Sequence, residues 1–164
     1  MVNQRLPSHK DPAERGYLRF FYRDWRPTRF GRLWTRLFAW VSGLGLTPRL
    51  LLTLQVKDRT TGHLHDTILA VASYQGHRYL VSMLGNGSEW VQNVRAADGQ
   101  ACIKRGWSYP VRLVEIPERE RAPILKAWCQ VATSGREHLP VSYHAPVADF
   151  EAIAADYPVF RIEE

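Results

Sequence analysis

YLVSMLGNGSEWVQNVRAADGQACIKR, residues 79–105, is the stretch that decides the fold prediction. It begins with a strand over 79–83 and continues through a loop that has glycines at 85 and 87. Ser88 suits the N-cap of a short helix, because its hydroxyl can accept a hydrogen bond from a first-turn amide. An Asp-Gly pair then stops the helix and opens a strand over 101–105. The remaining elements are placed around this order of strand, glycine loop, helix and strand.

The loop of this stretch has the features of an anion site. Glycines let backbone amides approach a ligand closely, and the N-terminus of a helix attracts negative charge. Trp90 offers a flat surface to a ring, and Arg95 is close in sequence. The same residues also fit a plain strand-to-helix turn with Trp90 in the core, so both interpretations stay open at this point.

The chain of 164 residues is basic, with a formal net charge of +6, and the charge is unevenly distributed. Residues 1–50 hold ten Arg or Lys residues against three acidic ones, whereas residues 51–164 hold 12 against 13. An apolar content of 45% fits one domain with a hydrophobic core. We therefore expect a basic, aromatic arm over 1–27 and a single domain over 28–164. An anionic partner should meet the arm.

Two cysteines are too few for a disulfide framework, which favours a reduced, intracellular protein. The N-terminus has no apolar signal core, and no apolar run reaches the length of about 18 residues that a membrane span needs. We therefore predict a cytoplasmic protein. The oligomeric state stays open.

Apolar periodicity predicts the other elements. Apolar side chains of residues 28–42 fill one arc of a helical wheel and arginines fill the opposite arc, which predicts an amphipathic N-terminal helix. Strands are also expected over 50–57, 65–74, 109–116 and 158–162, and the strand that opens the stretch quoted above can start one residue earlier, over 78–83. Further helices are expected over 118–132 and 147–155. Tight turns between consecutive strands imply a mainly antiparallel sheet. We predict an α+β fold, a barrel with helices packed on it.

An ordered set of motifs resembles the deazaflavin-dependent nitroreductase family, also called F420H2-dependent quinone reductases. WVQNVRA at 90–96 is the most specific piece, because it is similar to the Trp-Tyr-x-Asn-Leu-x-Ala helix of that family. The other pieces are RFGRLWTRLFAWVSG at 29–43, LLLTLQVKDRTTG at 50–62, GHRYLVSMLG at 76–85, PVRLVEIPERERAPILKAW at 110–128 and DFEAIAADYPVFRI at 149–162. The resemblance covers about residues 28–162.

The resemblance implies a split β-barrel of the FMN-binding kind that holds coenzyme F420, with FMN as the alternative cofactor. It also implies that a set of residues contacts the cofactor: Arg59, Ser82, Met83, Leu84, Gly85, Asn86, Trp90 and Asn93. Arg59 corresponds to the arginine of a basic turn in the family. The chain departs from the family one residue later, where Thr60 replaces a lysine.

The function that the resemblance implies is an F420H2-dependent oxidoreductase, which transfers a hydride to a quinone-like, nitro or other conjugated small-molecule acceptor. Such a transfer needs a donor for the oxyanion that develops, and Ser82 is the catalytic candidate. Tyr143 and His144 are the candidates for substrate contact. Two alternatives stay open: a barrel that binds F420 or a flavin without turnover, and a membrane-associated interaction protein. No metal is expected, because His63 and His65 lack a third ligand at a recognisable spacing.

The basic arm and the helix after it have three interpretations. Their arginines can form a solvated outer face, or residues 16–41 can attract anionic lipid, since arginines alternate there with aromatic residues. Lipid attraction would place the protein on the inner face of the membrane. The third interpretation is capture of the phosphate and polyglutamate tail of the coenzyme. Nucleic acid is not expected as a partner, because no recognition motif accompanies the charge.

Overall fold

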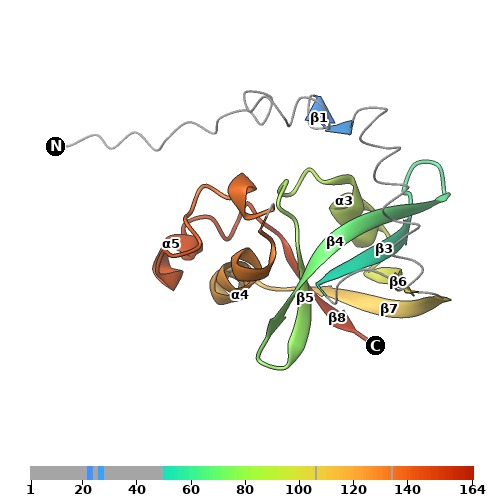
Figure 1. The fold of residues 1–164 in the computed structure, drawn as a ribbon. Coiled ribbons are helices and arrows are strands. Elements are labelled where there is room, and N and C mark those ends of the chain that lie inside the picture. Colours follow the sequence, from blue (N-terminus) through green and yellow to red (C-terminus); the bar gives the residue numbers. More distant parts are fainter. Residues whose placement is uncertain (1–21, 24–25, 28–49, 106, 134) are drawn as a thin grey trace.

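The computed structural model describes residues 22–23, 26–27, 50–105, 107–133 and 135–164 (Figure 1). The helix predicted over 28–42 and most of the arm predicted over 1–27 lie outside the described residues. Within the arm, β1 (Tyr22–Arg23) and β2 (Arg26–Pro27) pair antiparallel.

Six strands form a closed antiparallel barrel (Figure 1). Their order around the barrel is β3, β4, β5, β8, β7, β6, and β6 closes on β3. The strands are β3 (Leu51–Lys57), β4 (Leu64–Tyr74), β5 (His77–Val81), β6 (Gln100–Arg105), β7 (Trp107–Glu115) and β8 (Val159–Glu163). Closure leaves none of the six with an unpaired edge. The predicted α+β split barrel of the FMN-binding kind is confirmed.

The barrel interior is apolar because the strand sequences alternate with a period of two. In β3, for example, Leu52, Leu54 and Val56 are buried in the interior. β8 comes from the far end of the sequence and lies between β5 and β7, with Leu80 opposite Phe160. The helix α3 (Glu89–Ala96) adds its own buried face, Trp90, Val91 and Val94, to the same cluster. The core therefore joins the helix to the barrel.

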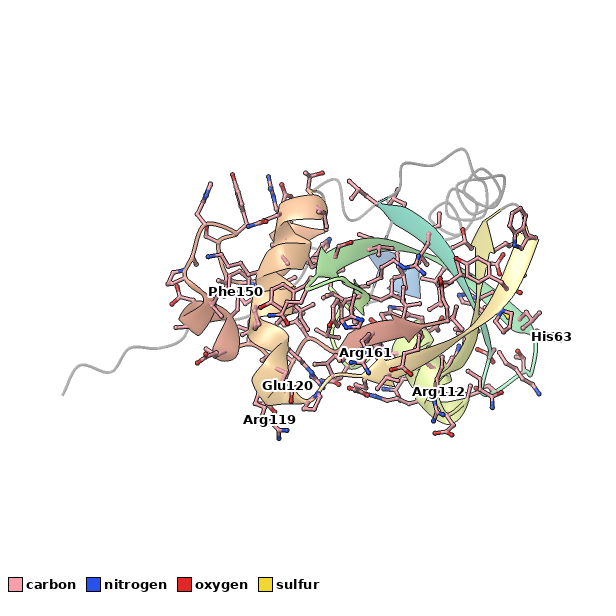
Figure 2. All side chains as sticks on the ribbon, turned by 90° about the horizontal axis from the view of Figure 1, so that it is seen from below. His63, Arg112, Arg119, Glu120, Phe150 and Arg161 are labelled. Atoms are coloured by element: carbon pink, nitrogen blue, oxygen red, sulfur yellow. The ribbon has the colours of Figure 1, made fainter. Side chains whose placement is uncertain are left out.

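A second apolar cluster lies outside the barrel, under two helices. α4 (Glu118–Val131) packs on β4, and α5 (Val147–Glu151) packs on α4. Trp128 donates its indole N–H to the carbonyl of Ala70 at 3.2 Å, which fixes α4 on the sheet. Figure 2 shows Phe150 on the side of α5 that faces α4, where it is fully buried. The loop between these helices contains a short 3-10 turn, η2 (Arg136–His138).

Two predicted elements are shorter in the structure than the sequence suggested. The strand expected over 78–83 ends at Val81, because the next residue, Ser82, turns the chain by donating its hydroxyl to the carbonyl of Gly85 at 2.8 Å. The helix expected over 147–155 ends at Glu151 and continues as turns. None of the helices in the described part of the chain has the length and apolar character that a membrane crossing requires.

Candidate functional site

The β3–β4 turn is organised by Asp58. The carboxylate of Asp58 accepts the backbone N–H groups of Thr61 at 2.7 Å and Thr60 at 3.0 Å, and the hydroxyl of Thr61 at 3.0 Å. These bonds, led by the Thr61 amide, lower the pKa of Asp58 from 3.8 to about 2. Gly62, with a φ of +74°, completes the reversal of the chain. The turn therefore holds a defined shape around Arg59.

Arg59 and Asn93, two of the residues expected to contact a cofactor, touch each other across 34 residues of sequence. The Nη1 of Arg59 donates to Oδ1 of Asn93 at 2.9 Å, and the backbone N–H of Arg59 donates to the same oxygen at 3.2 Å. Asn93 is 1% exposed, and its Nδ2 donates to Asp58 at 3.4 Å. Within the described ranges, no carboxylate forms an ion pair with Arg59. The neutral Asn93 thus positions this guanidinium and lies between it and the carboxylate of Asp58, which forms no ion pair with Arg59.

The loop between β5 and α3 is anchored by Asn86, another expected cofactor residue. Its Nδ2 donates to the carbonyl of Ala155 at 3.0 Å, and its Oδ1 accepts a hydrogen bond from Arg95 at 2.9 Å. Its backbone carbonyl accepts a hydrogen bond from the side-chain amide of Gln92 at 2.6 Å. The side chain of Asn86 is therefore engaged in shaping the loop.

The two glycines of this loop have different roles. Gly85 has a φ of +77°, and a Cβ there would lie 3.0 Å from the carbonyl oxygen of Asp156, so the loop conformation requires glycine. At Gly87 a Cβ would meet no atom of the described residues within 4 Å. The backbone at Gly87 thus borders open space, beside the first turn of α3, whose amides have no partner within the helix.

Ser82, the catalytic candidate, is buried and hydrogen-bonded within its own loop. It is 1% exposed, it donates its hydroxyl to the carbonyl of Gly85, and its oxygen lies 2.6 Å from the hydroxyl oxygen of Ser88. A hydroxyl has one proton to donate, so the Ser82 proton is not available to a developing oxyanion. Ser88 occupies the N-cap position of α3, but its side chain makes no capping bond. The pair of serines holds the loop instead.

Trp90, another expected cofactor contact, is also buried. It is 7% exposed and meets Phe160 edge to face in the barrel interior, with ring centroids 5.3 Å apart. Trp90 is therefore a core residue in this structure, and its contact with a cofactor stays a prediction. Met83 and Leu84 are partly buried, and Met83 packs on the outer cluster beneath α4.

The substrate candidates Tyr143 and His144 lie on the loop between α4 and α5. Their ring centroids are 3.8 Å apart, with the planes tilted by 38°. The guanidinium carbon of Arg136 lies 3.9 Å from the centroid of the Tyr143 ring. The structure therefore brings the two candidates together and adds a cation to them. His63, by contrast, lies at the tip of the β3–β4 hairpin, far from α5 (Figure 2).

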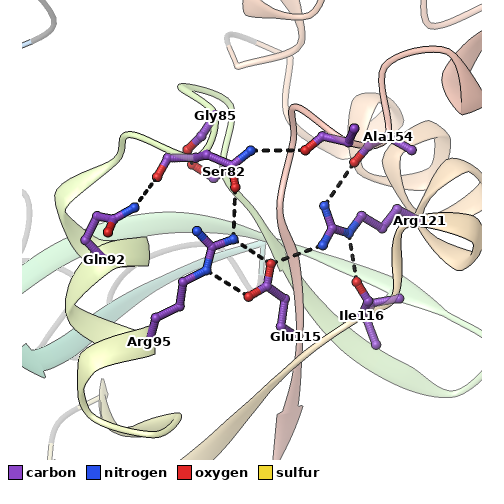
Figure 3. A network of polar contacts seen from close by, with 10 residues as sticks. Ser82, Gly85, Gln92, Arg95, Glu115, Ile116, Arg121 and Ala154 are labelled. Carbon is purple, nitrogen blue, oxygen red and sulfur yellow. Dashed lines mark hydrogen bonds and ion pairs between the residues drawn. The ribbon is translucent and has the colours of Figure 1, made fainter.

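Arg95, which lies next to the loop in sequence, is already paired. It donates to Glu115 from Nε at 2.9 Å and from Nη2 at 2.6 Å (Figure 3). Glu115 also accepts a hydrogen bond at 3.1 Å from Arg121, which donates to the carbonyls of Ile116 at 2.7 Å and Ala154 at 3.0 Å. The hydrogen bonds from Arg95 are the main cause that lowers the pKa of Glu115, and burial opposes them. Arg95 serves this network and is not available to an anion.

Two residues of this region were absent from the sequence prediction. Asp58 could have been found, because an Asp followed by Thr-Thr-Gly is typical of a turn in which the carboxylate accepts following amides. Arg136 had no local signal, since its contact with Tyr143 depends on the path of the loop between them.

Comparisons with known proteins concern the fold. No family model matches the chain, and no curated protein matches it. Among solved structures, it is similar to the Agrobacterium tumefaciens protein Atu2129, of unknown function, at 12% identity and a TM-score of 0.50, over 77% of this chain. The chain spans 53% of the length of Atu2129. At this identity the likeness shows the barrel fold alone.

Two further similar structures have lower TM-scores. One is an FAD-binding protein of Mesorhizobium loti, at 17% identity and a TM-score of 0.46, covering 77% of this chain and 87% of that one. The other is the F420-H2 dependent reductase FDR-A, at 22% identity and a TM-score of 0.40, covering 70% of this chain and 95% of that one.

Proposed function

We propose that the protein binds a phosphorylated flavin-type cofactor, F420 in first place and FMN as the alternative, and that it reduces a quinone-like, nitro or other conjugated acceptor. The observation that carries the proposal is the contact between Arg59 and Asn93. It joins two positions that the family resemblance marks as cofactor contacts, and within the described residues no carboxylate lies at ion-pair distance from Arg59. An oriented guanidinium of this kind is suited to a phosphate.

The residues of the site fit the anionic part of such a cofactor. Asn93 lies four residues into α3, about 6 Å along the helix axis from its first residue, so Arg59 contacts the second turn of α3, about one turn beyond the loop. The backbone at Gly87 borders open space on the loop side of the first turn. The loop amides and the guanidinium would therefore hold a ligand that spans about one helical turn.

When bound, a reduced deazaflavin would supply the hydride, and the protein would supply orientation. Arg59 and the loop amides would hold the phosphate, and the buried Asn93 would keep Arg59 in place. Trp90 contributes by fixing α3 on the barrel core. Met83 and Leu84 would form the apolar border of the site.

The test is a fluorescence titration of the full chain with F420, with FMN run in parallel, on the parent protein, Arg59→Ala and Arg119→Ala. Arg119 is the matched control, because its side chain is 82% exposed and, among the residues that the structure describes, its ion pair is with the neighbouring Glu120. We expect Arg59→Ala to weaken F420 binding by about tenfold or more, the effect of a lost hydrogen bond to a charged group. Arg119→Ala should bind like the parent. Absence of binding to both cofactors at micromolar concentration would refute the proposal.

A second function, cofactor binding without turnover, is favoured by the state of Ser82. The hydroxyl that was the catalytic candidate is buried and donates within its own loop. F420H2 that binds tightly but stays reduced with a panel of quinone and nitro acceptors would select this function. Oxidation of the bound cofactor by any of these acceptors would select the reductase.

A further inference from the structure

The loop between α4 and α5 stacks a cation on two rings. Arg136 lies over the Tyr143 ring, 3.9 Å from its centroid, and the Tyr143 and His144 rings are 3.8 Å apart. Arg136 and Tyr143 are half-buried, and His144 is exposed. A guanidinium stacked on an aromatic ring is more ordered than one in solvent and keeps its N–H edge for a ligand.

The polar groups of this stack are not engaged within the described part of the chain. No carboxylate there pairs with Arg136, and no acceptor there takes a hydrogen bond from its guanidinium. The hydroxyl of Tyr143 and the ring nitrogens of His144 likewise have no hydrogen-bond partner among those residues. Because Arg136 and His144 both lie against the Tyr143 ring, the stack offers the exposed His144 ring, one positive charge and several hydrogen-bond donors.

The stack is next to the proposed cofactor loop. Gly135 precedes Arg136, and a Cβ on it would lie 2.7 Å from Trp128 and 3.2 Å from the sulfur of Met83. Glycine at this position lets the loop approach Met83 closely. Figure 1 shows the α4–α5 loop rising toward the segment that joins β5 to α3. A molecule bound on the stack would thus lie close to a residue of the cofactor site.

We infer that Arg136, Tyr143 and His144 bind a planar aromatic anion, and that the acceptor reduced by this protein carries such a negatively charged group beside its ring. The assignment to the acceptor rests on the proposed function. The ring of the ligand would pack against the exposed His144 ring, and its carboxylate, sulfonate or enolate oxygen would accept hydrogen bonds from Arg136.

The binding test uses 2-naphthoate as the charged probe and 2-naphthalenemethanol as its neutral counterpart. Each is titrated into the full chain by calorimetry, and the ring protons of His144 are followed by NMR after assignment with His144→Gln. We expect Arg136→Ala to weaken naphthoate binding by about tenfold or more and to change the affinity for the alcohol less than twofold. Arg136→Lys keeps the charge without the planar group, and we expect it to restore binding only in part. Arg119→Ala is the control for net charge, and thermal melts check the folding of each variant.

Several results would overturn the inference. They are no naphthoate binding by the parent at millimolar concentration, equal losses for the acid and the alcohol in Arg136→Ala, and no shift of the His144 protons. A fall of F420 affinity in Arg136→Ala would assign the site to the cofactor and overturn the assignment to the acceptor. If neither F420 nor FMN binds while naphthoate binds through Arg136, the proposed function fails and the planar-anion site stands.

Discussion

At the scale of single residues, the hydroxyl of Ser82 serves to hold the loop between β5 and α3. Ser82→Ala removes the bond to Gly85 and leaves the Ser88 hydroxyl without its partner. We expect the free energy of unfolding to fall by about 1–2 kcal/mol, as measured by urea denaturation. Ser73→Ala, at an exposed position of β4, should change it by less than about 0.5 kcal/mol. An unchanged stability together with a lost rate of acceptor reduction would return Ser82 to the catalytic role.

Cys129 illustrates how burial can outweigh a nearby positive charge, that of Arg136, in setting the pKa of one thiol. It is fully buried, and burial raises the pKa of its thiol to about 11. A raised pKa favours the protonated thiol, so about one molecule in a thousand carries the thiolate at pH 8. We expect iodoacetamide at pH 8 to label the half-buried Cys102 before Cys129 in the native protein, and both cysteines in urea. Mass spectrometry of the parent and of Cys102→Ser reports each site, and equal native labelling would contradict the expectation.

At the scale of elements, the connection from α3 to β6 depends on Gly99. Its φ is +79°, and a Cβ would lie 2.4 Å from the carbonyl oxygen of Leu113, whose own N–H donates to Gly99. Gly76 has nearly the same φ, +78°, but a Cβ there meets nothing within 4 Å. Gly76→Ala should therefore lower the free energy of unfolding only by the cost of a left-handed backbone conformation at alanine, about 1–2 kcal/mol. Gly99→Ala should cost about 4 kcal/mol or more, because the backbone of β7 must also move. Similar midpoints of thermal unfolding for the two variants would contradict this expectation and would mean that the backbone of β7 shifts at little energetic cost.

At the scale of the whole molecule, Glu115 joins α3 to α4 through Arg95 and Arg121 (Figure 3). Its pKa is lowered, so its contribution to stability is present above the ordinary value of 4.5 and is lost as the pH falls through the lower folded value. We expect Glu115→Gln to lower the free energy of unfolding by about 1–3 kcal/mol at pH 7. The difference from the parent should shrink below pH 4.5, as the parent carboxylate itself becomes protonated.

The control for this prediction is Glu163→Gln, which breaks the more exposed ion pair between Glu163 and Arg161. We expect it to cost less than about 1 kcal/mol at pH 7. Urea denaturation of parent and variants at pH 7 and pH 3 measures both effects. A difference between parent and Glu115→Gln that does not depend on pH would mean that the charge of Glu115 is not what joins the helices.

The fold was predictable because its signals are local. The period of two in β3, the Asp-Gly turn at 98–99 and the glycine loop before α3 depend on residues that are neighbours in sequence, and the three hairpins β3–β4, β4–β5 and β6–β7 follow from short antiparallel connections. Closure of the barrel instead pairs strands that are distant in sequence. The family resemblance also singled out Arg59 and Asn93. The stretch 79–105 by itself determined the order of strand, loop, helix and strand at the candidate site.

Only the tertiary structure decided what each polar side chain of that site does. Trp90 turned toward Phe160 because the buried face of a helix is set by what it packs against. Ser82 met Ser88, and Arg95 met Glu115, because the closed loop and the barrel brought these groups within hydrogen-bonding distance. The stack of Arg136 on Tyr143 depends on the path of the loop after α4. Side-chain partners are chosen among groups that folding brings together from distant parts of the chain, and no local pattern specifies that choice.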